Sequence, residues 1–254
     1  MLTVEGLKKS YGGVQALRDL SFTATPGRVI GLLGPNGSGK STTINLLTGL
    51  MQPSAGTVRW NGLDIHRQLV SYQAMLGYVP EEPRLYAYLN AVEYLTLVGG
   101  LRDIDDAVVG RRIDRFLELF DLDSDRYAPL SAFSKGMRQK LLIAAALLHD
   151  PQVVIFDEPC SGLDVASTLT LRSVVRTLAD AGKTIVYISH VLDMVEKVCT
   201  DVIILHHGAV VAQDSVERLR ELSRVASLEA VFAKLAVDDN VEATGRAIAA
   251  VGTL

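Results

Sequence analysis

The 254-residue sequence predicts an α/β fold built on a largely parallel sheet. Short apolar runs that suit buried strands alternate with helical segments near both ends of the chain. Between them, about residues 90–150 read as helical, which indicates a helical subdomain inserted into the sheet. Because 48% of the residues are hydrophobic and 21% are charged, the chain can bury a sizeable core.

The N-terminal part is rich in expected strands. Residues 2–4, 20–24 and 28–33 form short apolar runs, and the last is compact enough for a fully buried strand. A helix is expected over 42–51, because Pro53 lies just past its end.

A hairpin is expected next. Residues 57–60 and 63–65 flank the pair Asn61-Gly62. This pair tolerates the positive φ angles of a type I′ turn, which joins two antiparallel strands tightly.

The middle of the chain predicts helices. Apolar residues recur at helical spacing over 91–101 and 110–122. Ser134 is a candidate cap for a further helix that runs to about His149, where Asp150-Pro151 ends it.

The last part returns to strands. Expected strands cover 153–156, 184–189 and 202–206, and a helix covers 165–180. The pair His207-Gly208 suggests a hairpin turn into a strand over 209–212. Residues from 216 onward are expected to be mostly helical and to lie outside the core.

A glycine-rich loop between an expected strand and helix predicts a phosphate site. It fits G-x-x-x-x-G-K-[ST] without a mismatch through Gly34, Pro35, Asn36, Gly37, Ser38, Gly39, Lys40 and Ser41. The glycines let backbone N–H groups converge on phosphate oxygens, and the helix N-terminus adds its positive dipole end. Lys40 can reach β- and γ-phosphates, and the Ser41 hydroxyl can bind Mg²⁺. A purely structural turn is the alternative.

Two carboxylates follow the apolar run 153–156. Asp157 stands where a parallel sheet presents ligands, so it is a candidate for the magnesium shell. Glu158 can orient or deprotonate an attacking water. His190 ends another apolar run and can donate to a γ-phosphate. The alternatives are a solvated strand end for the carboxylates and a structural role for the histidine.

Composition excludes some classes of function. The net charge is −4 and the pI is near 5.7, which does not favour a nucleic-acid partner. Cys160 and Cys199 cannot form a disulfide framework, so a reducing compartment is expected. Mean hydropathy is +0.24, but no apolar run approaches the ~20 residues of a membrane span, and the N-terminus has no secretory signal.

In their order along the chain, the motifs resemble the ATP-binding cassette (ABC) ATPase family of P-loop NTPases, over about residues 2–214. Residues 34–41 match the Walker A motif and 153–158 match Walker B with its glutamate. His190 matches the switch histidine, and Tyr11 stands where the family places an aromatic that stacks on adenine; a core aromatic is its alternative. The signature resemblance rests on Ser134, Lys135, Gly136 and Met137, and the D-loop resemblance on Ser161, Gly162, Leu163 and Asp164.

The resemblance implies a RecA-like core with an N-terminal antiparallel β subdomain and the inserted helical signature subdomain. It places the ATPase domain at 1–215, with the insertion at about 85–150, and a C-terminal helical extension at 216–254. ATP and Mg²⁺ are the implied cofactors. The implied catalytic residues are Glu158, His190 and Lys40, the nucleotide contacts extend from the glycine-rich loop to Thr42, and the implied metal ligands are Ser41, Asp157 and Glu81.

Three positions depart from the family pattern. Lys135 replaces the usual second glycine of the signature, Met137 replaces its final glutamine, and Glu81 replaces a metal-contacting glutamine. These strings are similar to the branch that serves ABC-2-type exporters, and residues 227–232 resemble that branch's C-terminal helix.

The chain carries one Walker A and one signature motif. In the family, two cassettes pair head to tail and each signature completes the partner's ATP site, so a homo- or heterodimer is implied. The resemblance predicts an ATP-hydrolysing subunit of an exporter, cytoplasmic and peripheral on the inner face of the membrane through a separate permease. The alternatives are a soluble non-transport ABC ATPase that acts on a macromolecular complex and a regulatory binder that does not hydrolyse ATP.

Overall fold

The computed structural model of the chain describes residues 1–223 and 227–236. Its strands are β1 (Leu2–Tyr11), β2 (Val14–Ala24), β3 (Val29–Leu33), β4 (Ala55–Trp60), β5 (Leu63–Asp64), β6 (Leu76–Val79), β7 (Val153–Asp157), β8 (Thr184–Ile188), β9 (Asp201–His206) and β10 (Ala209–Ser215). Its helices are α1 (Lys40–Leu47), α2 (Leu69–Ala74), α3 (Ala91–Leu101), α4 (Asp106–Leu119), α5 (Lys135–Leu147), α6 (Val165–Asp180), α7 (Leu192–Val198), α8 (Val216–Ser223) and α9 (Leu228–Ala236).

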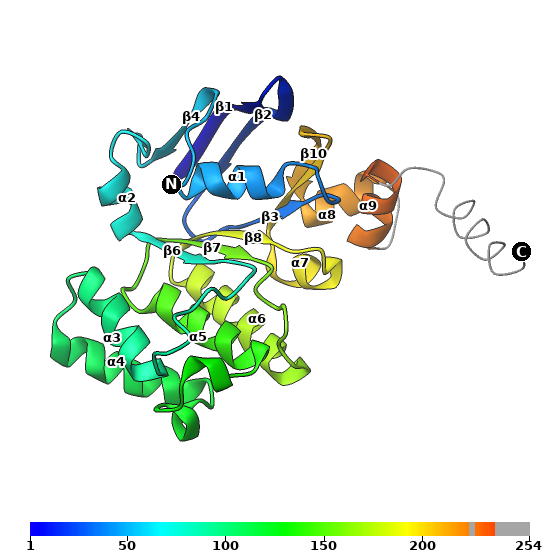
Figure 1. Cartoon of the computed structure of the whole chain (residues 1–254). Helices are drawn as coiled ribbons and strands as arrows, with labels where there is room; N and C mark the ends of the chain where they lie inside the picture. Colours follow the sequence, from blue (N-terminus) through cyan, green and yellow to red (C-terminus); the bar gives the residue numbers. More distant parts are fainter. Residues whose placement is uncertain (224–226, 237–254) are drawn as a thin grey trace, which may run out of the picture.

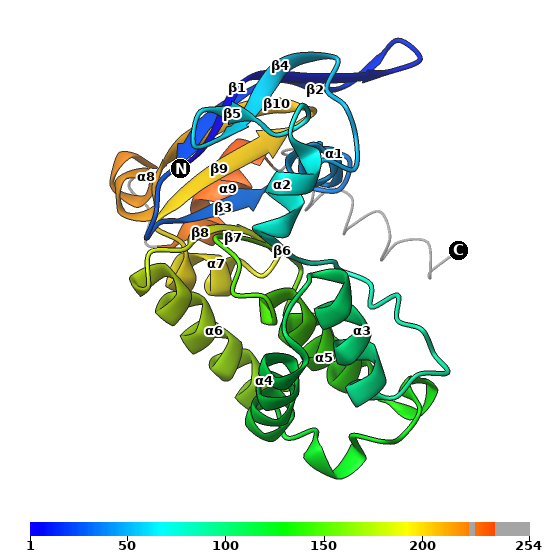
Figure 2. The same ribbon diagram turned by 90° about the vertical axis from the view of Figure 1, so that its left-hand side faces the viewer.

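The described strands form one mixed sheet in the order β5-β4-β1-β2-β10-β9-β3-β8-β7-β6. The pairs among β9, β3, β8, β7 and β6 are parallel, whereas β1 pairs antiparallel with β2 and with β4. A single residue pair, Ala209 with Asp19, joins β10 to β2 between the two parts. The antiparallel strands lie at the top of Figures 1 and 2, on the far side of the parallel strands from the helical subdomain. The predicted α/β class is confirmed.

Both faces of the parallel strands are buried, which explains their unbroken apolar runs. Along β7, Val153 and Ile155 join a core on the face that α1 covers, while Val154 and Phe156 join a core on the face that α5, α6 and α7 cover. This alternation follows from the two-residue period of a strand.

The N-terminal strands are longer than the sequence indicated. β1 and β2 continue to a turn at Gly12-Gly13, and register shifts interrupt their ladder. The predicted hairpin is confirmed, since Asn61 and Gly62 have φ angles of 49° and 83° between β4 and β5. The sequence missed the four-residue strand β6, which has only β7 as a neighbour among the described strands.

The inserted helices α3, α4 and α5 pack on a core of their own, with Leu95, Ile113 and Leu141 almost fully buried. The predicted bounds of α3 and α6 agree with the structure. Asn90 begins α3 with a reciprocal capping box with Glu93. The predicted cap of α5 is also confirmed, because Ser134 Oγ accepts a hydrogen bond from the Met137 backbone N–H.

The expectation that the chain after residue 216 lies outside the core was wrong. Val216 and Leu219 of α8 and Leu228 of α9 are 3%, 6% and 0% exposed, and they belong to the same core as α7. An amphipathic pattern predicts that a helix has an apolar face, but it does not predict which surface of the protein covers that face. Residues 237–254 of the proposed extension lie outside the described residues.

Candidate functional site

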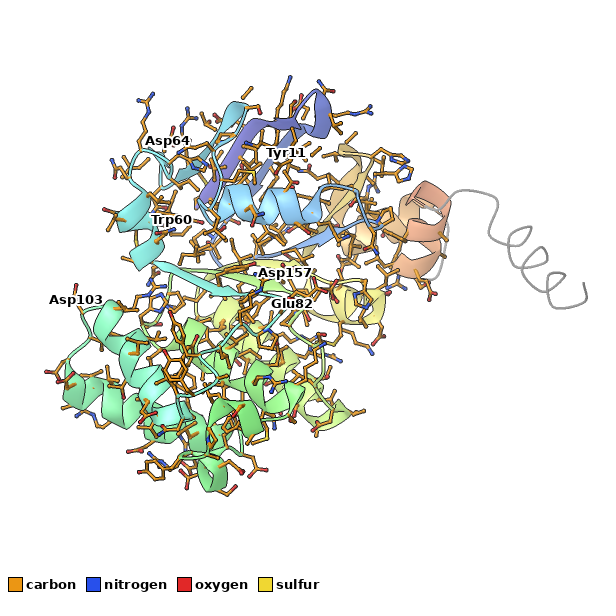
Figure 3. The ribbon with its side chains drawn as sticks, viewed as in Figure 1. Tyr11, Trp60, Asp64, Glu82, Asp103 and Asp157 are labelled. Carbon is orange, nitrogen blue, oxygen red and sulfur yellow. The ribbon has the colours of Figure 1, made fainter. Side chains whose placement is uncertain are left out.

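A cavity of about 700 Å³ opens where β3, β6, β7 and β8 end, which is the edge where parallel sheets bind ligands. It gathers the predicted phosphate loop, Asp157, Glu158, His190 and Glu81 from segments far apart in the chain. The residues that line it are Ala16, Leu33, Gly34, Pro35, Asn36, Gly37, Gly39, Lys40, Ser41, Thr42, Glu81, Asp157, Glu158, Ser189, His190, Leu192 and Phe232. Figure 3 labels Asp157 at the centre of the molecule, below α1 and close to Glu82.

The glycine-rich loop wraps tightly before α1. Gly39, at the helix N-cap, has a φ of 106°, and a Cβ there would lie 2.7 Å from the Ala16 carbonyl oxygen. A side chain at Gly34 would collide with the Leu205 carbonyl oxygen and with Ser38. Only glycine fits these positions, so the backbone can approach a phosphate group closely. Ser38, the one residue of the motif that does not line the cavity, is buried, and its Oγ has no hydrogen-bond partner among the described residues.

Lys40 folds over the loop that precedes it. Its Nζ donates to the carbonyl oxygens of Gly34 at 2.6 Å and Pro35 at 3.1 Å. Burial lowers the pKa of Lys40, while the charges of Glu158 and Asp157 act against that shift. A cation held in this position faces the cavity and is available for an anionic ligand.

Three carboxylates, Asp157, Glu158 and Glu81, line one side of the cavity, and the positive charge of Lys40 offsets them only in part. Burial, together with the charges of Glu81 and Glu158, raises the pKa of Asp157 to about 6, although Lys40 acts in the opposite direction. Burial and the neighbouring Asp157 likewise raise the pKa of Tyr78 to about 12. A divalent cation would relieve this repulsion.

The oxygen ligands of the cavity fit Mg²⁺. Ser41, Asp157 and Glu81 all line it and offer hydroxyl and carboxylate oxygens. Within residues 1–223 and 227–236, no cluster of three or more His, Cys, Asp or Glu side chains could hold an ion unaided. That arrangement suits Mg²⁺, which proteins commonly hold with one or two carboxylates and the phosphates of the substrate.

Glu158 is held on three sides. Its side chain is 10% exposed, Oε2 accepts a hydrogen bond from Ser189 Oγ at 3.0 Å, and Oε1 accepts one from the His190 backbone N–H at 2.8 Å. The same Oε1 lies 2.8 Å from His190 Nδ1. Glu158 also has a φ of 47°, a strained backbone conformation that aims its side chain across the end of β8. The structure therefore places the His190 ring beside the glutamate.

The signature residues lie elsewhere. The Lys135 Nζ donates to Ser161 Oγ of the D-loop at 2.7 Å, and a Cβ at Gly136 would lie 2.7 Å from the Gly162 carbonyl oxygen. The signature and D-loop therefore touch one another. All eight of their residues lie in the described part of the chain, and none of them lines the cavity.

Tyr11 is not brought to the cavity. It is 43% exposed, its hydroxyl lies 2.8 Å from Met51 Sδ, and Lys9 Nζ lies 5.3 Å from the centre of its ring. Figure 3 places it at the end of the antiparallel strands, above α1. Adenine stacking on Tyr11 stays a prediction.

Sequence reasoning missed five residues of the cavity wall: Ala16, Leu33, Ser189, Leu192 and Phe232. Ser189 directly precedes His190, so the prediction of His190 could have been extended to it. Phe232 comes from a helix at the far end of the chain, and its local sequence carries no sign that it lies at a phosphate loop.

The comparisons with known proteins agree with this geometry. The family model described as ABC transporter matches residues 17–161. The ABC transporter ATP-binding protein NatA of Bacillus subtilis (strain 168) is 36% identical over 220 residues, or 86% of this chain and 89% of that protein. The Nod factor export ATP-binding protein I of Ralstonia nicotianae is 34% identical over 219 residues, or 86% of this chain and 68% of that protein. A solved ATP-binding subunit of an ABC transporter superposes with a TM-score of 0.87 at 33% identity, and the match covers 92% of this chain and 98% of that chain.

Proposed function

The chain belongs to the ABC transporter family, and from this premise we propose that it is the ATP-hydrolysing subunit of an exporter and powers a separate membrane permease. The part of the chain that the structure describes contains no helix that is both long and apolar enough to cross a membrane. The name of the Nod factor relative supports export as the direction, and favours transport over a soluble ATPase that acts on a macromolecular complex.

The cavity supports hydrolysis of a nucleoside triphosphate. Backbone N–H groups of the glycine-rich loop bind phosphate oxygens, and Lys40 exchanges its two carbonyl contacts for the β- and γ-phosphates. Glu158 orients and deprotonates the attacking water, with its carboxylate fixed by Ser189 and His190. Ser41 and Asp157, with Glu81 beside them, would hold Mg²⁺, which would supply positive charge to the phosphates.

The observation that carries the proposal is the separation of the signature from the cavity of its own chain. Ser134 and Gly136 lie at the N-terminus of α5, a position that suits an anion, yet neither lines the phosphate cavity. A second cassette, arranged head to tail, would bring its signature to this cavity and receive this chain's signature in return. ATP between the two chains would then hold them together, and hydrolysis would release them.

A second cavity, of about 450 Å³, supports a docking site for the permease. It lies between the end of α1, α2 and the end of α3, and Leu50, Val70 and Leu101 on its rim are 66%, 83% and 77% exposed. An apolar rim on a polar surface is typical of a protein contact. We place a cytoplasmic helix of the permease at this cavity, and the chain itself at the inner face of the membrane.

The ATPase domain is proposed at 1–215, with the helical subdomain at about 85–150. Residues 216–254 are proposed as a C-terminal extension, whose helices α8 and α9 pack on the core of that domain. Tyr11 is proposed for adenine stacking and Ser134 to Met137 for the partner's phosphates. No nucleic acid is expected as a partner.

The test is recovery of the tagged full chain from native membranes. We expect it to co-purify with a polypeptide of several apolar spans, and we expect Val70→Glu to reduce that recovery while ATP hydrolysis by the isolated chain is unchanged. Val14→Glu is the matched control, because Val14 is 70% exposed and lies outside this cavity. Recovery with ribosomes alone would favour the soluble ATPase instead.

A further inference from the structure

Phe232 lines the phosphate cavity, and no nucleotide-binding motif accounts for its presence there. It is half-buried on α9, packs against the main core and lines the same cavity as Glu158 and His190. Leu192, the first residue of α7, lines the cavity as well. In Figure 1, α9 lies beside α7 and α8, at the end of the molecule that carries the glycine-rich loop.

Glu196 ties the three helices together. This α7 side chain is 24% exposed, and its Oε1 lies 3.1 Å from Arg220 Nη1 of α8. Its Oε2 accepts a hydrogen bond from the Leu228 backbone N–H at 3.1 Å, which satisfies a free donor at the start of α9. One carboxylate therefore fixes α8 and α9 against α7.

The loop that carries His190 is held at one end by Glu158 and at the other end by α7, on which Glu196 lies. At one end, the His190 backbone N–H donates to Glu158, and the Val191 N–H donates to Ser189 Oγ. At the other end, the loop passes directly into α7, whose position depends on Glu196 and on the buried Leu228. A displacement of α9 would thus shift the His190 loop and one wall of the cavity together.

We propose that Phe232 is a wall residue of the nucleotide pocket, and that Glu196 is a positioning residue that holds the His190 loop through α8 and α9. The C-terminal helices are then part of the catalytic unit. This inference rests on the proposed ATPase function, because the ligand that Phe232 would face is a nucleoside triphosphate.

The substitution Phe232→Trp tests whether residue 232 lies in the wall of the nucleotide pocket. The chain has one natural tryptophan, Trp60, which is 7% exposed in the core on the opposite face of the sheet. In full-length Phe232→Trp, titration with ATP and Mg²⁺ should give a saturable change of emission, with the midpoint that calorimetry finds for ATP. Tyr127→Trp is the control, since Tyr127 is 72% exposed and remote from the cavity lining, and its emission should not respond.

The outcomes separate the inference from the proposed function. If calorimetry shows that Phe232→Trp binds ATP while the emission of this variant stays constant, the wall assignment is wrong. If the indole itself blocks ATP, the smaller Phe232→Leu variant should bind ATP more tightly than Phe232→Trp, and this result supports the assignment. If the unaltered chain binds no ATP, the proposed function fails, and the inference fails with it.

Glu196→Ala tests the positioning role. We expect kcat for ATP hydrolysis to fall roughly tenfold or more with KM little changed, because a misplaced His190 loop disturbs Glu158 and leaves the phosphate loop intact. Glu196→Gln, which keeps an acceptor for the Leu228 N–H, should recover part of kcat. Arg218→Ala breaks the exposed pair with Glu221 on the same α8 and should leave kcat unchanged. A folded Glu196→Ala protein with unaltered kcat would overturn the proposal.

Discussion

The carboxylate of Glu158 is held more firmly than that of a solvated strand end, which suits the proposed role of general base. This residue lies in the cavity wall, three groups fix its carboxylate, and its backbone has a positive φ angle that costs energy. Asp157, one residue earlier, is only half-buried and has a raised pKa. Two adjacent carboxylates thus have different surroundings, which suits different tasks.

Glu158→Gln should therefore keep ATP binding and lose hydrolysis. The amide retains the shape and the hydrogen-bond acceptor but cannot take a proton from water, so we expect phosphate release to fall by about 10²-fold or more. Phosphate release is measured beside ATP affinity. Glu82→Gln is the control, because the Glu82 side chain is 76% exposed and does not line the cavity. Full activity in Glu158→Gln would remove this residue from the base role.

Asp157→Asn should stabilise the nucleotide-free protein at high pH. The pKa of Asp157 rises from 3.8 to about 6 on folding, so the folded state binds the proton more tightly than the unfolded chain. Folding then loses stability as pH rises from about 4 to about 6, and the whole cost remains above that range. We expect the melting temperature of the variant to exceed that of the original chain at pH 8 and to converge with it near pH 4, as measured by calorimetry. An equal difference at both pH values would contradict the raised pKa.

The sequence predicted the phosphate loop and both carboxylates because each belongs to a motif of consecutive residues. It failed to predict Phe232 and the pairing of His190 with Glu158, because these contacts join segments that are far apart in the chain. Glu81 was predicted as a metal ligand by resemblance, and its presence in the cavity is compatible with that role.

At the scale of the element, α3 and α5 offer a matched pair of helix caps. Asn90 accepts from the Glu93 N–H and Ser134 accepts from the Met137 N–H, so each side chain satisfies one free donor of its helix. Only Ser134 is also a candidate contact for a partner's phosphate.

Asn90→Ala and Ser134→Ala should each lower the free energy of unfolding by about 1 kcal/mol. Their activities should differ. Asn90→Ala should hydrolyse ATP normally per folded molecule, whereas Ser134→Ala should lose most of its hydrolysis. Urea unfolding and phosphate release measure the two quantities. Normal hydrolysis by Ser134→Ala would restrict Ser134 to its role as a cap.

Helices with caps and clear periodicity, such as α3 and α6, were predicted well from local sequence. The strand β6 was missed because four residues carry little periodic signal, and its pairing with β7 depends on residues more than seventy positions away. α8 and α9 were recognised as helical but placed outside the core, since their buried partners lie on α7.

At the scale of the whole molecule, the phosphate cavity and the signature of one chain lie on separate surfaces, and this predicts complementation. Lys40→Ala disables the cavity and keeps the signature, while Ser134→Ala does the reverse. Each variant alone should be inactive. A mixture should recover part of the activity, because half of the mixed dimer's sites combine an intact cavity with an intact signature.

Phosphate release from the mixture, compared with each variant alone, measures this recovery. Lys40→Ala mixed with Glu158→Gln is the control, since both changes fall in the cavity and no intact site can form. A mixture of Lys40→Ala and Ser134→Ala that stays inactive would contradict a site shared between two chains.

The strand order has a consequence for how the chain acquires its structure during synthesis. β3, which leads into the phosphate loop, pairs with β8 and β9, both of which are synthesised much later than β3. At a synthesis rate of roughly 5–20 residues per second, the ribosome needs on the order of ten seconds or more after β3 before both neighbours exist. During that interval the apolar strand has neither edge paired, so the nascent chain is exposed to aggregation and to chaperones. The nucleotide site therefore forms only after β8 and β9 have been made, long after its glycine-rich motif has been synthesised.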